Sequence, residues 1–269
     1  MSERHLMFIF NIAVFSIFAI LATIVYCVQK TQTKNIMSPD YDLTQYQNPL
    51  FTVDSVLFTI LQDSLKVLLV KRANAPFKGR WGLPGGFVDV ELDDNTDMSA
   101  LRKIKEKTSV APQYLEQLQA FSGINRDPRG FSVTLVYYAL ISPQQVATQI
   151  DSVDDVRWVD LSEIPDLAVA FDHKHIIEKA KARLQQKALY SMIPVYCLPD
   201  QFTIGQLKTA IEAIIAKPIQ RKSLVRRIEA SNMFEALDEK VKSGGRLAQL
   251  YKLKPDADIV HFERNLSLG

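Results

Sequence analysis

The sequence predicts an α+β protein in which a β-rich domain is followed by a small basic module of two helices and a hairpin. Three observations support this fold class: β-rich runs surround one helical stretch in residues 51–140, residues 203–254 read as helix, helix and hairpin, and residues 6–28 carry no charge. The chain has 269 residues, which suggests two domains. Its 47% hydrophobic and 23% charged residues exclude disordered, collagen-like and disulfide-stapled chains.

The first expected element is a hydrophobic, transmembrane helix over residues 6–28. At about 1.5 Å per residue this uncharged run spans roughly 34 Å, enough for a bilayer core. Because Lys30 and Lys34 follow it, we expect a cytoplasmic body anchored in the inner membrane, with residues 29–48 as a linker. Two alternatives stay open: a buried core helix, or translation from Met37 instead of Met1.

The next elements are a hairpin and a glycine-rich loop. The β-rich runs 51–60 and 65–70 are separated by Gln-Asp-Ser, which favours a tight turn between antiparallel strands. Residues 79–88 follow with the sequence Gly-Arg-Trp-Gly-Leu-Pro-Gly-Gly-Phe-Val. Glycine lacks a Cβ, so Gly85 and Gly86 allow the backbone to approach another group closely.

A helix is expected after an acidic stretch. Asn95 or Thr96 is a suitable N-cap, and Ala100 and Ile104 recur at helical spacing until Pro112 ends the pattern. A second helix over residues 171–186 closes this domain.

Residues 81–110 resemble the Nudix hydrolase signature, in which a Gly-Gly loop leads into a helix with the pattern Arg-Glu-apolar-x-Glu-Glu-x-Gly. From position 102 this chain reads Arg-Lys-Ile-Lys-Glu-Lys-Thr-Ser. The run Arg-Asp-Pro-Arg-Gly at residues 126–130 resembles the branch of the family that handles ADP-ribose. The resemblance implies a Nudix α/β/α sandwich with a mixed sheet over residues 49–187.

The helix departs from the enzyme pattern at its metal-binding positions. In the enzymes glutamates on one helix face hold Mg²⁺, and the matching positions here are Lys103, Glu106 and Lys107, with a net charge of +1. Leu92 stands where an upstream glutamate is usual, and Asp94 lies two residues later. We therefore expect no metal, no cofactor and little diphosphate hydrolysis. The alternative is an active Mg²⁺-dependent ADP-ribose diphosphatase, with Glu106 catalytic and helped by one of three acids: Asp89, Glu91 or Asp94.

A fold that has lost its metal can still bind a nucleotide. Lys103 and Lys107 would neutralise a diphosphate where the ions sit in the enzymes, and arginine suits bidentate phosphate contact. The alternative for each cation is a solvated surface position. The predicted ligand-binding residues are Lys71, Arg72, Gly85, Gly86, Phe87, Lys103, Lys107, Arg126 and Arg129.

The C-terminal module, residues 188–269, is basic although the whole chain has a net charge of only +2. Residues 203–254 hold eleven Lys or Arg against five Asp or Glu. Such a charge concentration favours a polyanionic partner.

The same stretch has the order of a winged helix-turn-helix. A capping-box pattern opens a helix at Thr203, a second helix is expected over residues 219–231, and the Ser-Gly-Gly-Arg run at 243–246 is a turn between strand-like pieces. Such modules place the second helix in the major groove of DNA and the wing along the backbone. A helical hairpin with a solvated basic face is the alternative. The predicted DNA-binding residues are Arg221, Lys222, Ser223, Arg226, Arg227 and Arg246.

An altered Nudix domain followed by a winged helix is similar to the Nudix-related transcriptional regulators that control NAD biosynthesis genes. The resemblance covers about residues 49–255, and in that family ADP-ribose or a related nucleotide alters operator binding. It implies a homodimeric repressor of NAD biosynthesis or salvage genes, with operator DNA and ADP-ribose as partners. Two alternatives stay open: an active ADP-ribose hydrolase, and a membrane-tethered module whose basic part binds anionic lipid.

Overall fold

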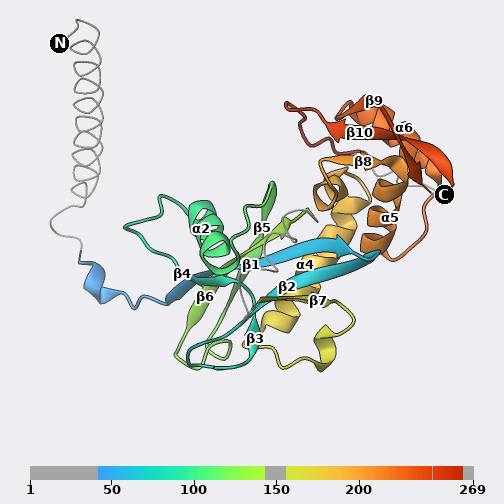
Figure 1. The fold of residues 1–269 in the computed structure, drawn as a ribbon. Helices are drawn as coiled ribbons and strands as arrows, with labels where there is room; N and C mark the ends of the chain where they lie inside the picture. The colour runs from blue at the N-terminus through green and yellow to red at the C-terminus, as the bar shows by residue number, and fades with distance from the viewer. Residues whose placement is uncertain (1–41, 143–155, 244, 263–269) are drawn as a thin grey trace, which may run out of the picture. The chain divides into compact units, whose positions relative to one another are not determined.

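The strands between Leu50 and Asp160 form a seven-stranded mixed sheet (Figure 1). The computed structural model describes residues 42–142, 156–243 and 245–262. The chain divides after Asn48 into two units, and the second contains the sheet. Within these residues no helix is long and apolar enough to cross a membrane. The helix expected over residues 6–28 lies outside the described ranges.

The strands follow the order β3-β2-β1-β6-β5, with β4 also paired to β1 and β7 to β2. Because β1 is parallel to β6 and antiparallel to β2 and β4, the sheet is mixed. The strands of the sheet are β1 (Leu50–Leu61), β2 (Ser64–Lys71), β3 (Trp81–Gly82), β4 (Gly85–Phe87), β5 (Tyr114–Gly123), β6 (Ser132–Leu140) and β7 (Val156–Asp160), followed by the 3-10 helix η2 (Ile164–Asp166). The first unit contains the 3-10 helix η1 (Leu43–Gln45).

The predicted hairpin is confirmed. Its turn residues Gln62 and Asp63 have φ values of 52° and 59°, the left-handed pair that a two-residue turn between twisted strands needs.

Two helices cover opposite faces of the sheet: α2 (Thr96–Thr108) and α4 (His173–Ala188). Ala100 and Ile104 of α2 pack on one face, whereas Ile176 and Leu184 of α4 pack on the other. The predicted α/β/α sandwich is therefore confirmed, and we call β1 to α4 the sheet domain.

Both ends of α2 follow from local sequence. Asn95 is the N-cap, and its side chain accepts a hydrogen bond from the Met98 backbone N–H at 2.9 Å. Ser109 ends the helix in the left-handed conformation with φ 56°, where the Nudix pattern has glycine.

The C-terminal part is a winged helix, as predicted. Its core joins Phe202, Leu207, Leu224 and Ile228, all buried. A three-stranded sheet in the order β8-β10-β9 flanks two helices. The elements are η3 (Ile193–Cys197), β8 (Gln201–Thr203), α5 (Ile204–Ile215), α6 (Arg221–Ser231), β9 (Phe234–Ser243) and β10 (Arg246–Leu253).

Helix α4 connects the winged-helix module, β8 to β10, to the sheet domain. Ile214 of α5 is fully buried in the same apolar cluster as Ile176 and Leu184. The Gln185 side-chain amide donates a hydrogen bond to the Ile214 carbonyl at 3.0 Å. Apolar packing and a hydrogen bond therefore join α4 to the last turn of α5.

Candidate functional site

The sheet domain holds a cavity of about 530 Å³ bounded by β1, the loop after β2, β4, α2, the β5–β6 loop and the start of α4. Five cationic side chains line it against three carboxylates, so the cavity favours an anionic ligand. The cations are Lys71, Arg72, Lys107, Arg126 and Arg129, and the carboxylates are Asp54, Glu106 and Asp127.

Eight of the nine predicted ligand-binding residues line this cavity. The ninth, Lys103, lies beside it, because its Cε would be 3.3 Å from a Cβ added at Gly86. The structure thus brings the predicted residues together, and their binding role remains a prediction.

The two arginines of the Arg-Asp-Pro-Arg-Gly run are held by carboxylates. Arg126 donates to Asp172 through Nε at 3.1 Å and Nη2 at 3.0 Å, and its Nη1 lies 3.1 Å from the Ser132 hydroxyl. Arg129 pairs with Asp127 at 2.7 Å, and its guanidinium lies 5.1 Å from the centre of the Phe87 ring. A ligand phosphate would compete with these carboxylates for the same bidentate donors.

Arg72 is fixed differently. Its Nε donates to the Pro76 carbonyl at 2.9 Å, and its guanidinium lies 4.7 Å from the centre of the Phe171 ring. Burial, together with the nearby Arg129, lowers the pKa of Arg72 from its ordinary value, which still leaves the side chain cationic at neutral pH.

A buried histidine forms part of the cavity wall. The Nδ1 atom of His173 accepts a hydrogen bond from the Leu83 backbone N–H at 2.9 Å, so the proton of the neutral ring is on Nε2. Nε2 lies 3.9 Å from Oδ1 of Asp54, whose other oxygen accepts from the Thr134 hydroxyl at 2.7 Å. Burial lowers the pKa of His173, which keeps the ring neutral at pH 7.

Gly85 permits the close contact between β4 and β1. A Cβ at this position would overlap Asp54 Oδ1 and the Val53 carbonyl oxygen. The expectation that this glycine serves a close backbone approach is confirmed.

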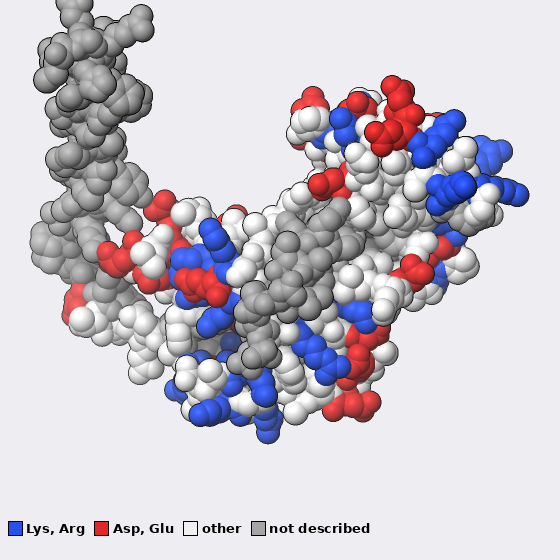
Figure 2. Space-filling view, in the orientation of Figure 1, with Lys and Arg blue, Asp and Glu red and all other residues white. Residues whose placement is uncertain are grey.

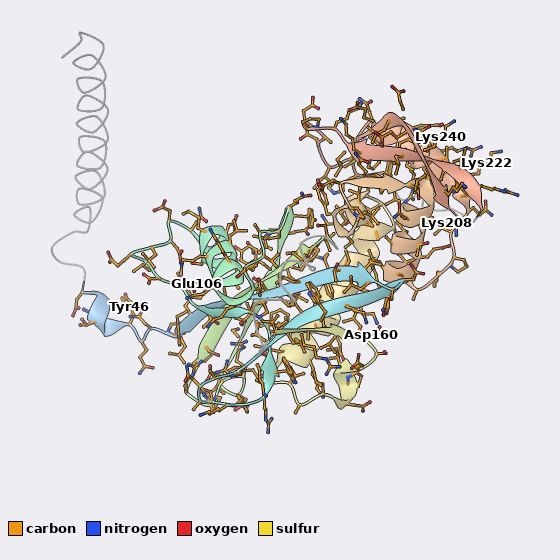
Figure 3. All side chains as sticks on the ribbon, viewed as in Figure 1. Tyr46, Glu106, Asp160, Lys208, Lys222 and Lys240 are labelled. Atoms are coloured by element: carbon orange, nitrogen blue, oxygen red, sulfur yellow. The ribbon has the colours of Figure 1, made fainter. Side chains whose placement is uncertain are left out.

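The carboxylate on the α2 face is already neutralised by cations. Glu106, which is labelled in Figure 3, accepts from Arg102 at 2.8 Å and from Lys103 at 3.2 Å. The bond from Arg102 lowers the pKa of Glu106. Arg102 also binds the buried Asp93, whose pKa falls well below its usual range for the same reason.

The donors on this face suit a divalent cation poorly, because hard cations need several oxygen ligands and the carboxylate of Glu106 already accepts from Arg102 and Lys103. Among the described residues, no three His, Cys, Asp or Glu side chains group in a way that could hold a metal ion.

Lys and Arg side chains gather on the winged-helix module (Figure 2), and helix α6 supplies several of them. On α6, Leu224 and Ile228 are buried, whereas Arg221, Lys222 and Arg226 are exposed, as is the predicted Ser223. Lys222 and Arg226 are four residues apart and therefore share one side of the helix. The structure places these predicted residues on the exposed side of α6, and their contact with DNA remains a prediction.

Two contacts hold the helix-turn-helix geometry. Thr203 caps α5 with a full capping box, because its hydroxyl accepts from the Gln206 N–H and the Gln206 side chain accepts from the Thr203 N–H. Glu212 accepts from the Ile219 backbone N–H at 2.7 Å, which fixes the turn before α6.

Arg227 and Arg246 differ in their settings. Arg246 is exposed at the start of β10, opposite Ser243 in the wing. Arg227 is half-buried, with its guanidinium 5.3 Å from the centre of the Phe262 ring. Arg227 therefore lies next to the side of α6 that carries Lys222 and Arg226, not on it. Its contact with DNA remains a prediction.

Sequence reasoning missed several cavity residues. Asp54 and His173 were not among the predicted site residues, because only the placement of α4 against β1 brings them together. Asp127 was visible two residues before Arg129, a spacing that allows a local ion pair.

Two family models match the chain. The NUDIX domain model matches residues 51–180, and the NrtR DNA-binding winged helix domain model matches residues 194–253.

The chain is similar to a transcriptional repressor and to two solved structures of a second one. A protein named ADPR responsive transcriptional repressor NtrR, from Acinetobacter baylyi, is 40% identical over 212 residues, which is 79% of this chain and 85% of that protein. The crystal structure of Shewanella oneidensis NrtR complexed with a 27mer DNA is 48% identical with a TM-score of 0.77, over 81% of this chain and 99% of that chain. The structure of the NUDIX domain of that NrtR complexed with ADP ribose is 47% identical with a TM-score of 0.50, over 55% of this chain and 99% of that chain.

Proposed function

Because the chain belongs to the NrtR family of Nudix-related transcriptional repressors, we propose that it binds operator DNA through its winged-helix module and that ADP-ribose in the 530 Å³ cavity changes this affinity. The coupling is reciprocal, so DNA changes the affinity for ADP-ribose by the same factor. The predicted target genes are those of NAD biosynthesis and salvage.

One observation carries the proposal. Glu106 accepts from both Arg102 and Lys103 at the wall of a cavity lined by five cations. An ADP-ribose diphosphate supplies the negative charge that this cavity lacks, whereas Mg²⁺ would have to displace two cations from Glu106. The site therefore supports binding without cleavage.

The DNA-binding part rests on α6 and the wing. Exposed cations on one side of α6 and at Arg246 give the positive surface that phosphate contacts require. We propose a homodimer, because a winged helix reads one half-site and a two-fold operator needs two copies.

The test is a fluorescence anisotropy titration of the full chain on promoter fragments of NAD genes, with and without ADP-ribose. We expect tight, sequence-specific binding whose Kd changes with ADP-ribose. Equal affinity for promoter and random DNA would overturn the proposal. Mg²⁺-dependent AMP release that disappears in Glu106→Gln would instead support the hydrolase alternative.

A single residue sharpens the test. Arg226→Ala should weaken operator binding by about 1–3 kcal/mol and random DNA less, because a base contact discriminates between sequences. Arg157→Ala, which removes an exposed arginine of the sheet domain, is the control and should change neither. Equal losses on both DNAs for Arg226→Ala would show that Arg226 contacts only phosphate.

A further inference from the structure

The ion pair between Arg126 and Asp172 closes one wall of the ligand cavity. Arg126 lines this cavity and is nearly buried, with 9% of its side chain exposed. Both oxygens of Asp172 accept from its guanidinium, at 3.0 and 3.1 Å. A phosphate group offers the same pair of acceptors, so a diphosphate that reaches Arg126 competes directly with Asp172.

Asp172 occupies the N-cap position of α4 without capping the helix. Its carboxylate makes no hydrogen bond to the first turn, and its backbone has φ −92° and ψ 17°. Among the described helices, Asn95 and Thr203 do cap with their side chains, and both have extended backbones, with ψ of 173° and 157°. Phe171, just before, is left-handed with φ 53°, an unfavourable conformation for an aromatic residue. The carboxylate of Asp172 is thus paired with Arg126 and leaves the first turn of α4 without a side-chain cap.

A released Asp172 has a second favourable position available. Aspartate is among the preferred N-cap residues, because its carboxylate accepts hydrogen bonds from the N–H groups of the first helical turn. The same carboxylate thus has two alternative partners, the Arg126 guanidinium and the N-terminus of α4. Choosing the second requires the backbone at Asp172 to turn toward the extended region.

The far end of α4 contacts the DNA-binding part. Gln185 donates to the Ile214 carbonyl at 3.0 Å in the last turn of α5, and α6 begins shortly afterwards at Arg221. A hollow of about 230 Å³ lies among the ends of α4, α5 and α6, with Leu189 and Ser223 in its lining. Packed helices move as rigid bodies, so a shift of α4 displaces α5 and has space to do so.

We propose that Asp172 is a positioning residue that couples the ligand cavity to the winged-helix module. The ligand diphosphate binds Arg126 in place of Asp172, and the freed carboxylate then caps α4. The resulting shift of α4 is passed to α5 and α6 through the contact between Gln185 and Ile214. This inference rests on the proposed function, since it specifies how ADP-ribose changes DNA affinity. The bistable element is the Phe171–Asp172 segment.

The experiment measures the coupling ratio, which is the DNA Kd with saturating ADP-ribose relative to the Kd without it, in the full chain. In the unmodified chain we expect the ratio to differ from one by about 5–150-fold. In Asp172→Asn the ligand no longer has to displace a carboxylate, so ADP-ribose should bind more tightly while the ratio approaches one. Asp172→Glu retains the negative charge, so its coupling ratio should differ from one more than that of Asp172→Asn does.

Two further variants separate coupling from folding. Gln185→Leu should leave the affinity for ADP-ribose unchanged and bring the coupling ratio closer to one, because it removes the hydrogen bond to Ile214. Glu163→Gln removes a carboxylate from the exposed pair with Arg157 and should behave as the unmodified chain. If Asp172→Asn does not fold, as judged by thermal melting, Gln185→Leu decides the question alone.

The outcomes distinguish the relay from the proposed function. If the DNA affinity of the unmodified chain does not respond to ADP-ribose, the proposed function fails and the relay fails with it. If the unmodified chain responds and Asp172→Asn or Gln185→Leu responds equally, only the relay is overturned. The relay is supported if the coupling ratio is close to one in both Asp172→Asn and Gln185→Leu while each variant still binds DNA and ADP-ribose.

Discussion

Replacing Gly85 with alanine should destabilise the sheet domain by about 3 kcal/mol. The added Cβ would overlap Asp54 Oδ1 and the Val53 carbonyl oxygen and would lie 2.9 Å from Asp54 Cα. Two of these three atoms belong to the backbone of β1, so no side-chain rotation relieves the overlap and β4 must move away. The pairing of β4 with β1 and the bond from the Ser55 N–H to the Pro84 carbonyl would then be lost. At about 1 kcal/mol for each hydrogen bond, about three lost bonds give this magnitude.

The assay is urea denaturation followed by tryptophan fluorescence. Both tryptophans, Trp81 and Trp158, lie in the sheet domain and report on it. Gly205→Ala is the matched control, because the only nearby atom is the Thr203 hydroxyl at 3.5 Å, and alanine in a helix is up to about 1 kcal/mol more favourable than glycine. A free energy of unfolding for Gly85→Ala within about 0.5 kcal/mol of the unmodified chain would refute the reasoning.

Three further outcomes are expected. Asn95→Ala should lower the free energy of unfolding by about 1 kcal/mol in the same urea assay, since it removes the α2 cap, and an unchanged midpoint would contradict this. Hydrogen bonds from Ser162 and then Ser64 lower the pKa of Asp160 from 3.8 to about 2. Because this carboxylate has a lower pKa in the folded chain than in the unfolded chain, it stabilises the folded state at a pH above the unfolded pKa. The free energy of unfolding should therefore fall by up to about 2 kcal/mol as the pH is lowered from about 4 to 2, and Asp160→Asn should remove this pH dependence. Lys222→Ala should reduce the slope of log affinity against log salt by about 1 on any DNA, and an identical slope would show that Lys222 contacts no phosphate.

Local sequence signals predicted most of the fold. The hairpin turn, the Asn95 cap, the Thr203 capping box and the wing turn each depend on residues close together in the chain, so spacing alone identifies them. The glycine pair predicted a close approach, and the structure shows β1 as the partner at Gly85.

The ion pairs of the site were harder to predict, because they depend on tertiary placement. Arg126 was expected to face a ligand, yet its partner Asp172 comes from the start of a helix far along the chain. Lys103 and Lys107 were expected to replace metal ions together, whereas Lys103 is bound to Glu106. The i, i+4 spacing of Arg102 and Glu106 did carry a usable signal, since such pairs are neighbours on a helix.

Thr203 belongs to two elements at once. It pairs with Leu250 in the small sheet, and its hydroxyl caps α5, so β10 and the first helix of the module meet at one residue. A substitution at Thr203 therefore acts on the wing strand and on α5 together.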